Sequence, residues 1–202
     1  MPFAHDIYEE LKQADFADQI GYARYLCEEI LEKDPDHGPT LIRYASNLIA
    51  LAQYQDAAKA LSRAESVVPR KWVHLVLAQH GHLLEHKGNF VDAQAKFLEA
   101  HEHDPDDATY LIYAGSVAFR CGDISGAEQF ARKAIKCTEG CIDEAYFNLG
   151  GYLLSQKRYA EARDCYLQAL AIDRDYRLAK ARLTDVERIL NYQVKQVNGG
   201  NR

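Results

Sequence analysis

The sequence predicts an all-α fold, a solenoid of stacked helix–turn–helix repeats. The 202-residue chain aligns to itself at a period near 34 residues, and self-similarity at such a period is the signature of a repeat architecture. Within each period, apolar residues recur at helical spacing in two runs separated by a short break. No run of alternating apolar and polar residues competes as a strand.

Five units are expected, starting near residues 4, 38, 74, 108 and 143 and together covering residues 4–177. The first unit is degenerate, and the third is the clearest. The recurring positions of the third are His80-Gly81, Leu84, Gly88-Asn89-Phe90, Ala93, Phe97, Ala100 and Asp104-Pro105. Those of the fifth are Tyr146, Leu149-Gly150, Leu153, Tyr159, Ala162, Tyr166, Ala169 and Ile172-Asp173.

Glycines inside the units predict where helices end and where they approach closely. Gly88 and Gly122 fall in the breaks, where glycine can end one helix before Asn89 or Asp123 caps the next. Other glycines fall in mid-helix, where each costs ~1 kcal/mol relative to alanine. This cost is understandable if a second helix must approach there. The mid-helix glycines are Gly81, Gly115 and Gly150, and the matching small residues are Ala93, Ala127 and Ala162.

The C-terminal part of the chain predicts one longer helix over residues 176–197, followed by a flexible tail at 198–202. Its apolar stripe comprises Leu183, Val186, Leu190, Val194 and Val197. The last unit of a stacked array has an exposed apolar face, so a capping helix is expected to cover it.

These recurring small, aromatic and turn residues resemble the tetratricopeptide repeat (TPR) family. The resemblance implies a right-handed superhelical solenoid of about five repeats plus a capping helix. It further implies a noncatalytic protein–protein interaction module, that is, an adaptor, scaffold or chaperone-like binder. In such a module the first helix of each repeat lines a concave groove, and the groove holds a partner peptide or helix. Transferring the family's groove positions, and adding the flanking residues Tyr113 and Asn148, gives Ile42, Ile49, Leu75, His82, Ile112, Tyr113, Phe119, Phe147, Asn148 and Leu154 as the expected partner-binding residues.

One subfamily binds the acidic C-terminal tails of heat-shock chaperones through Lys, Asn and Arg at fixed groove positions. No fifth position here is Lys and no ninth position is Asn; only Arg43 and Asn148, at sixth positions, match the pattern in part. A chaperone-tail clamp is therefore not expected. The apolar groove positions favour a segment with apolar anchors instead.

Composition excludes several other classes. The net charge of −6 argues against a nucleic-acid partner, and no apolar stretch is long enough to span a membrane. The charge is uneven, with 10 acidic and 3 basic residues in 1–37 and 6 acidic and 10 basic in 156–202. This asymmetry keeps a second interpretation open, a self-assembling structural protein and homo-oligomer. Five scattered cysteines and the lack of a signal peptide predict a cytoplasmic protein.

Two short motifs carry potential chemistry. The run from His82 to His86 matches H-x-x-E-H, in which two histidines bind zinc and the glutamate, here Glu85, activates water. Because the run lies inside a repeat helix, we expect His82 and His86 to face the groove or the solvent. A metal-dependent hydrolase is the least favoured alternative. Cys137 and Cys141 share a glycine-containing loop and are expected to be ordinary thiols, with a redox-linked disulfide or half of a zinc site as the alternatives. The sequence predicts no cofactor and no enzyme.

Overall fold

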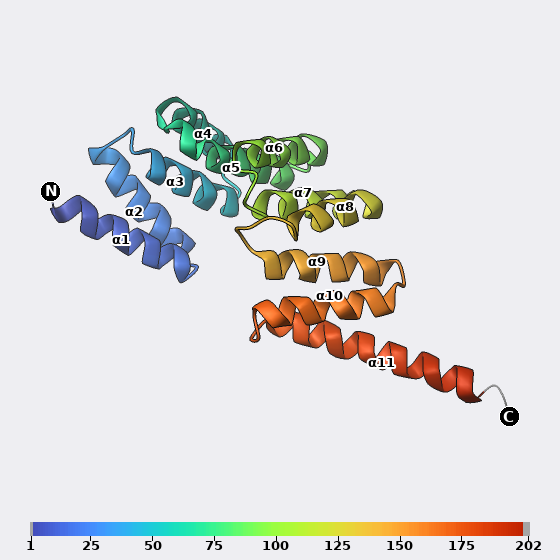
Figure 1. Cartoon of the computed structure of the whole chain (residues 1–202). Coiled ribbons are helices and arrows are strands. Elements are labelled where there is room, and N and C mark those ends of the chain that lie inside the picture. The colour runs from blue at the N-terminus through green and yellow to red at the C-terminus, as the bar shows by residue number, and fades with distance from the viewer. Residues whose placement is uncertain (1, 200–202) are drawn as a thin grey trace. The chain divides into compact units, whose positions relative to one another are not determined.

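The computed structural model describes residues 2–199, with the side chains of residues 7–15 and 17–196. Within this range the chain forms eleven α-helices, one short 3-10 turn and no strand (Figure 1), which confirms the all-α class. The helices are α1 (Pro2–Phe16), α2 (Ile20–Lys33), α3 (Gly38–Ala50), α4 (Tyr54–Val67), α5 (Val73–His86), α6 (Phe90–His103), α7 (Thr109–Arg120), α8 (Ile124–Ala134), α9 (Ile142–Ser155), α10 (Tyr159–Ile172) and α11 (Arg177–Gly199).

The chain divides into two compact units, residues 1–103 with α1 to α6 and residues 104–202 with α7 to α11. In both units each helix packs against the next along the chain, forming hairpins that Figure 1 shows side by side. First helices of neighbouring repeats also touch directly, α3 against α5 in the first unit and α7 against α9 in the second. This pattern of contacts is that of a helix–turn–helix solenoid.

All five turns inside the repeats contain a residue in the left-handed backbone region. Gly88 (φ 79°) and Gly122 (φ 83°) occupy two of them, as expected, and Asp123 caps α8 by accepting the Gly126 N–H at 2.8 Å. The other three turns use non-glycine residues, Asp18, Ala52 and Lys157, with φ between 55° and 61°. The same turn therefore recurs where the sequence lacks the glycine that would indicate it.

The mid-helix glycines lie where large rings press on the first helix of a repeat. A Cβ atom added to Gly81 would lie 2.5 Å from Cε1 of Phe97, and one added to Gly150 would lie 2.7 Å from Cε1 of Tyr166. Both rings are fully buried. The contact at Gly115 is looser, at 3.4 Å from Cβ of Phe130. Glycine thus allows the second helix of a repeat to place an aromatic ring directly against the first.

Helix α11 closes the second unit by packing against α10. Its Val186 is fully buried, and Leu183 and Leu190 pack against the same core cluster as Tyr166. Val194 is 58% exposed, so the apolar stripe leaves the core before the helix ends. The helix continues to Gly199, two residues past the expected end. The side chain of Val197 and residues 200–202 of the expected tail lie outside the described part of the chain.

The segment between α8 and α9 is held by backbone hydrogen bonds to the segment before α7. Asp106 O accepts the N–H groups of Thr138 and Glu139 at 3.2 and 3.0 Å, and Ala108 N–H donates to Glu139 O at 3.0 Å. Gly140 turns the chain back with φ 84°.

Across the described residues, no helix is both long and apolar enough to cross a membrane.

Candidate functional site

The second unit contains a pocket of about 450 Å³ on the first helices of its two repeats. We call it the α7–α9 pocket. It is lined by Ser116, Phe119, Arg120, Phe147, Asn148, Gly151, Tyr152, Leu154, Ser155, Tyr166 and Arg182. Four of the residues expected from the sequence are therefore brought together here: Phe119, Phe147, Asn148 and Leu154.

Helical spacing explains why α9 supplies most of the wall. Phe147, Gly151 and Leu154 follow one another at i, i+4 and i+7, so they lie on one face of the helix. A Cβ atom at Gly151 would meet nothing within 4 Å, which shows open space above this position. The pocket is open here because glycine interrupts a row of large side chains.

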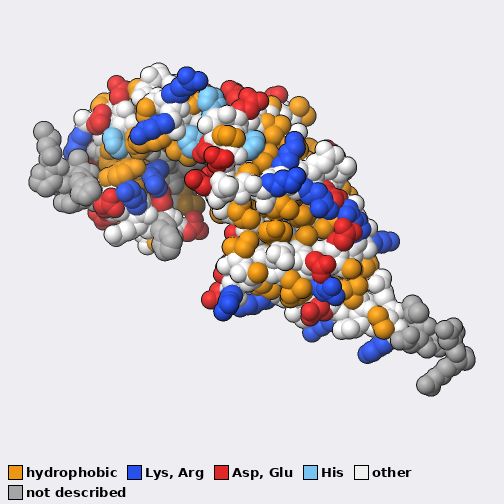
Figure 2. Space-filling model, in the orientation of Figure 1, with side chains coloured by type: hydrophobic (Ala, Val, Ile, Leu, Met, Phe, Trp, Pro, Cys, Tyr) orange, Lys and Arg blue, Asp and Glu red, His pale blue; other side chains and the backbone are white. Residues whose placement is uncertain are grey.

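Aromatic rings form the floor of the pocket. Phe119 and Tyr152 have ring centroids 5.0 Å apart, and Phe147 lies 5.8 Å from Tyr166 and 5.0 Å from Tyr176. Phe119 is 39% exposed, whereas Tyr152 and Tyr166 are buried. In space-filling view, hydrophobic side chains gather over the helices of the second unit (Figure 2). An exposed aromatic ring above a buried aromatic layer is a surface suited to an apolar side chain of a partner.

Polar groups at the edge of the pocket are engaged in local hydrogen bonds. Burial raises the pKa of Tyr152, while its hydrogen bond with Ser116 partly opposes that rise. Burial together with the charge of Asp143 raises the pKa of Glu144, and its hydrogen bond with Asn148 acts in the opposite direction. The Asn148 side chain is therefore oriented by its hydrogen bond with the Glu144 carboxyl group, one helical turn away.

The other expected groove residues do not line the α7–α9 pocket. Ile42 and Leu75 line a pocket of about 400 Å³ in the first unit, together with Tyr8, Pro39, Arg43 and Trp72. Ile49 and Ile112 are each only 4% exposed, so little of either side chain is accessible to a partner. Tyr113 is half-buried and is not among the residues that line the α7–α9 pocket.

Sequence reasoning missed a polar pocket of about 370 Å³ in the first unit. Arg43 of α3 and Asp15 of α1 both line it and form an ion pair, and Asn47 Nδ2 lies 3.5 Å from the same carboxylate. The Arg43 guanidinium also lies 5.8 Å from the Tyr8 ring. Asp15 belongs to no recognisable sequence motif. It reaches Arg43 because the degenerate first repeat packs against α3.

The H-x-x-E-H run lies on α5, as its position in the repeat predicts. His82 Nδ1 lies 3.6 Å from Glu85 Oε2, and the His82 ring packs edge-on against Phe97 at 5.0 Å. His86 is directed to the Tyr54 ring, 6.4 Å away. Within the described residues, no group of three His, Cys, Asp or Glu side chains is placed to hold a metal ion. Each histidine of the motif instead has an aromatic neighbour.

Cys137 and Cys141 are both free thiols. Cys137 Sγ lies 3.7 Å from Pro105 O and 3.8 Å from Lys133 O. Burial and nearby carboxylates raise the pKa of both thiols. Because the thiolate is the reactive form, this environment lowers their reactivity.

Comparison with known proteins supports the helical repeat fold described above. Tetratricopeptide repeat family models match residues 78–140 and 143–176. The human tetratricopeptide repeat protein 7A is 31% identical over 119 residues, which are 59% of this chain but only 14% of that protein. A thermophilic TPR protein from Thermus thermophilus superposes with a TM-score of 0.73 at 20% identity, covering 91% of this chain and 98% of that one.

A second similar structure contains a bound peptide. It is the first TPR of Spaghetti (RPAP3) bound to an HSP90 peptide, with a TM-score of 0.54 at 20% identity, covering 58% of this chain and 93% of that one. At these identities the solved structures support the fold. The family models, in agreement with the paired helices described above, identify residues 78–140 and 143–176 of this chain as tetratricopeptide repeats.

Proposed function

We propose that this protein is a noncatalytic interaction module that binds an extended or helical segment of a partner protein in the α7–α9 pocket. The observation that carries the proposal is the exposed Phe119 ring, 39% accessible, above the buried ring of Tyr152. The TPR fold supports the general role of protein–protein interaction. The cysteine pattern supports a cytoplasmic setting as part of the same proposal.

The pocket has the size and composition for one large apolar side chain. Its volume of about 450 Å³ lies within the range of small-ligand sites, and its floor is built from aromatic rings. An anchor residue of the partner would lie on Phe119, while open space above Gly151 admits the partner backbone. Such anchors commonly contribute ~2 kcal/mol or more each to an interface.

The test begins with selection of binding peptides from a displayed library of random linear peptides. Phe119→Ala is expected to weaken binding of the selected peptides at least ~30-fold, which corresponds to ~2 kcal/mol. Leu167→Ala is the matched control, because Leu167 on α10 is 44% exposed and lies outside the pocket. Equal binding by the two variants would refute the site.

Phe147 is a poorer probe than its groove position suggests. Its ring packs against Tyr166 and Tyr176 and belongs to the rim of the second-unit core. Phe147→Ala therefore removes core packing as well as pocket surface, and its loss of stability is expected to exceed that of Phe119→Ala. Both melting temperatures are measured alongside the affinities.

A further inference from the structure

The α7–α9 pocket has a positively charged rim. Arg120 from the end of α7 and Arg182 from α11 both line it, and no aspartate or glutamate is among the lining residues. Both arginines are exposed. The apolar floor is thus bordered by two guanidinium groups without a carboxylate in the wall.

Among the residues that the structure describes, Arg182 makes one loose ion pair. Its Nη1 lies 4.0 Å from Oδ2 of Asp185, one turn along the same helix, and the two side chains are 57% and 56% exposed. This distance is too long for a hydrogen bond. The guanidinium therefore keeps short-range donor capacity for a ligand, and solvent screens its pairing with Asp185.

The pocket of the first unit shows the contrasting arrangement. There Arg43 lines the wall together with Asp15, and the two side chains form an ion pair between α1 and α3. A ligand carboxylate at Arg43 would first have to displace Asp15. In the α7–α9 pocket, none of the lining residues supplies such an internal competitor for Arg182.

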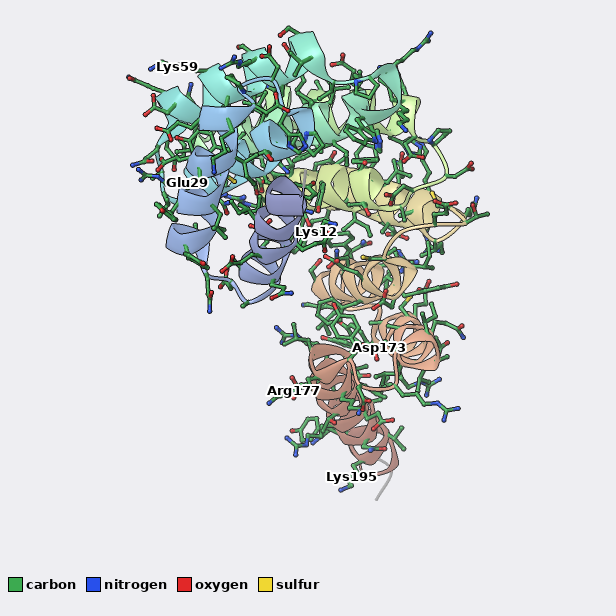
Figure 3. All side chains as sticks on the ribbon, turned by 90° about the vertical axis from the view of Figure 1, so that its left-hand side faces the viewer. Lys12, Glu29, Lys59, Asp173, Arg177 and Lys195 are labelled. Carbon is green, nitrogen blue, oxygen red and sulfur yellow. The ribbon has the colours of Figure 1, made fainter. Side chains whose placement is uncertain are left out.

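The surroundings of Arg182 reinforce the positive potential. Helix α11 has five basic and two acidic residues between Arg177 and Gly199. Figure 3 shows Arg177 and Lys195 projecting from this helix. The charge of Arg182 also acts on the floor, where it lowers the pKa of Tyr166 against the larger raising effect of burial.

We infer that the α7–α9 pocket selects a partner segment in which a large apolar residue lies next to the carboxylate of the chain terminus. The inference rests on the proposed function and adds the chemistry of the partner to it. The apolar side chain occupies the aromatic floor, and the carboxylate accepts hydrogen bonds from Arg182, with Arg120 adding a second positive charge. Guanidinium groups can bind a carboxylate through two parallel N–H donors, and the apolar floor beside it reduces screening by water.

Three small probes separate the two parts of this recognition. N-acetylphenylalanine has the apolar ring and a carboxylate, N-acetylphenylalaninamide has the ring alone, and N-acetylglycine has the carboxylate alone. Each is titrated into the full chain labelled with ¹⁵N, and the shifts of the Ser116 and Gly151 amide signals report binding. The acid is expected to bind ~3-fold to 5-fold more tightly than the amide, the range of an exposed ion pair. N-acetylglycine is expected to bind most weakly of the three.

Substitution of the arginine assigns the preference to its source. Arg182→Gln is expected to abolish the preference for the acid over the amide, so that the ratio of the two affinities falls to about one. Arg163→Gln is the matched control, because Arg163 on α10 is exposed, lies outside the pocket and removes the same charge. Raising the salt concentration should weaken binding of the acid but not of the amide.

The outcomes distinguish this inference from the proposed function. Equal affinity for the acid and the amide overturns the carboxylate inference and leaves the apolar site in place. A preference that survives Arg182→Gln, or equal binding of N-acetylglycine and N-acetylphenylalanine, also overturns it. If neither phenylalanine probe shifts the pocket amides, the pocket takes no apolar anchor and the proposed function itself fails.

Discussion

Adjacent glycines on α9 provide a sensitive test of how the repeats pack. Gly150 faces Tyr166, and a Cβ atom there would lie 2.7, 2.9 and 3.0 Å from three ring carbons. Gly151 faces open space, with nothing within 4 Å. Gly150→Ala therefore introduces a clash with a fully buried ring, whereas Gly151→Ala introduces none.

The magnitudes follow from two opposing effects. Replacing a mid-helix glycine by alanine stabilises a helix by ~1 kcal/mol. Forcing a methyl group into a packed interior costs about 2–3 kcal/mol at such distances. Gly150→Ala should thus lower the free energy of unfolding by about 1–2 kcal/mol, while Gly151→Ala should raise it by about 0.5–1 kcal/mol.

Urea denaturation followed by circular dichroism measures both variants against the wild type. Gly81→Ala serves as an independent replicate in the first unit, because its Cβ would lie 2.5 Å from the buried Phe97 ring. If Gly150→Ala stabilises the protein as much as Gly151→Ala does, the Tyr166 ring does not press on α9 and the packing described above is refuted.

Other expected outcomes concern the capping helix, pH and thiol reactivity. Deleting residues from Tyr176 onward removes Leu183, Val186 and Leu190 from the second-unit core, so the truncated protein should melt lower or aggregate; an unchanged melting temperature would show that α11 is dispensable. The pKa of Glu128 is about 2, because hydrogen bonds with Gln156, Arg132 and Arg158 outweigh the opposing effect of burial. A lowered carboxyl pKa stabilises the fold above the ordinary pKa and loses that effect as the pH falls through the folded value. Glu128→Gln should therefore cost about 1 kcal/mol at neutral pH and progressively less as the pH falls toward ~2 in urea titrations. Burial raises the pKa of Cys27 to about 12, so its thiol should react with a disulfide reagent only on unfolding, whereas the exposed Cys121 should react in the native protein; rapid labelling of Cys27, located by mass spectrometry, would contradict its burial.

Periodicity made the fold predictable because the repeat is enforced by local sterics. Gly81 and Gly150 must be small where Phe97 and Tyr166 pack against them, so the pairs recur visibly in the sequence. Turn positions were less predictable. Ala52 and Lys157 adopt the same left-handed conformation as Gly88 and Gly122, and the energy of the surrounding repeat is sufficient to hold them there.

The candidate site was predictable only in part. Phe119, Phe147, Asn148 and Leu154 meet in one pocket because the register of first helices places them on a common face. The same register placed Ile49 and Ile112 on the groove floor, but a small rotation about the helix axis separates groove from core, and both are buried. Arg182 could not be found this way, because it comes from α11, which lies outside the repeat register.

The central claim is that partner binding occurs at the α7–α9 pocket, and backbone NMR of the full chain with a library-selected peptide tests it most directly. The amide signals expected to shift most are those of the pocket wall, at Ser116, Phe119, Phe147 and Gly151. Signals of the outward-facing second helices, such as those of Arg163 and Leu167 on α10, should remain in place. Shifts concentrated on α8 and α10, or in the first unit around Trp72, with an unperturbed Phe119, would contradict the claim.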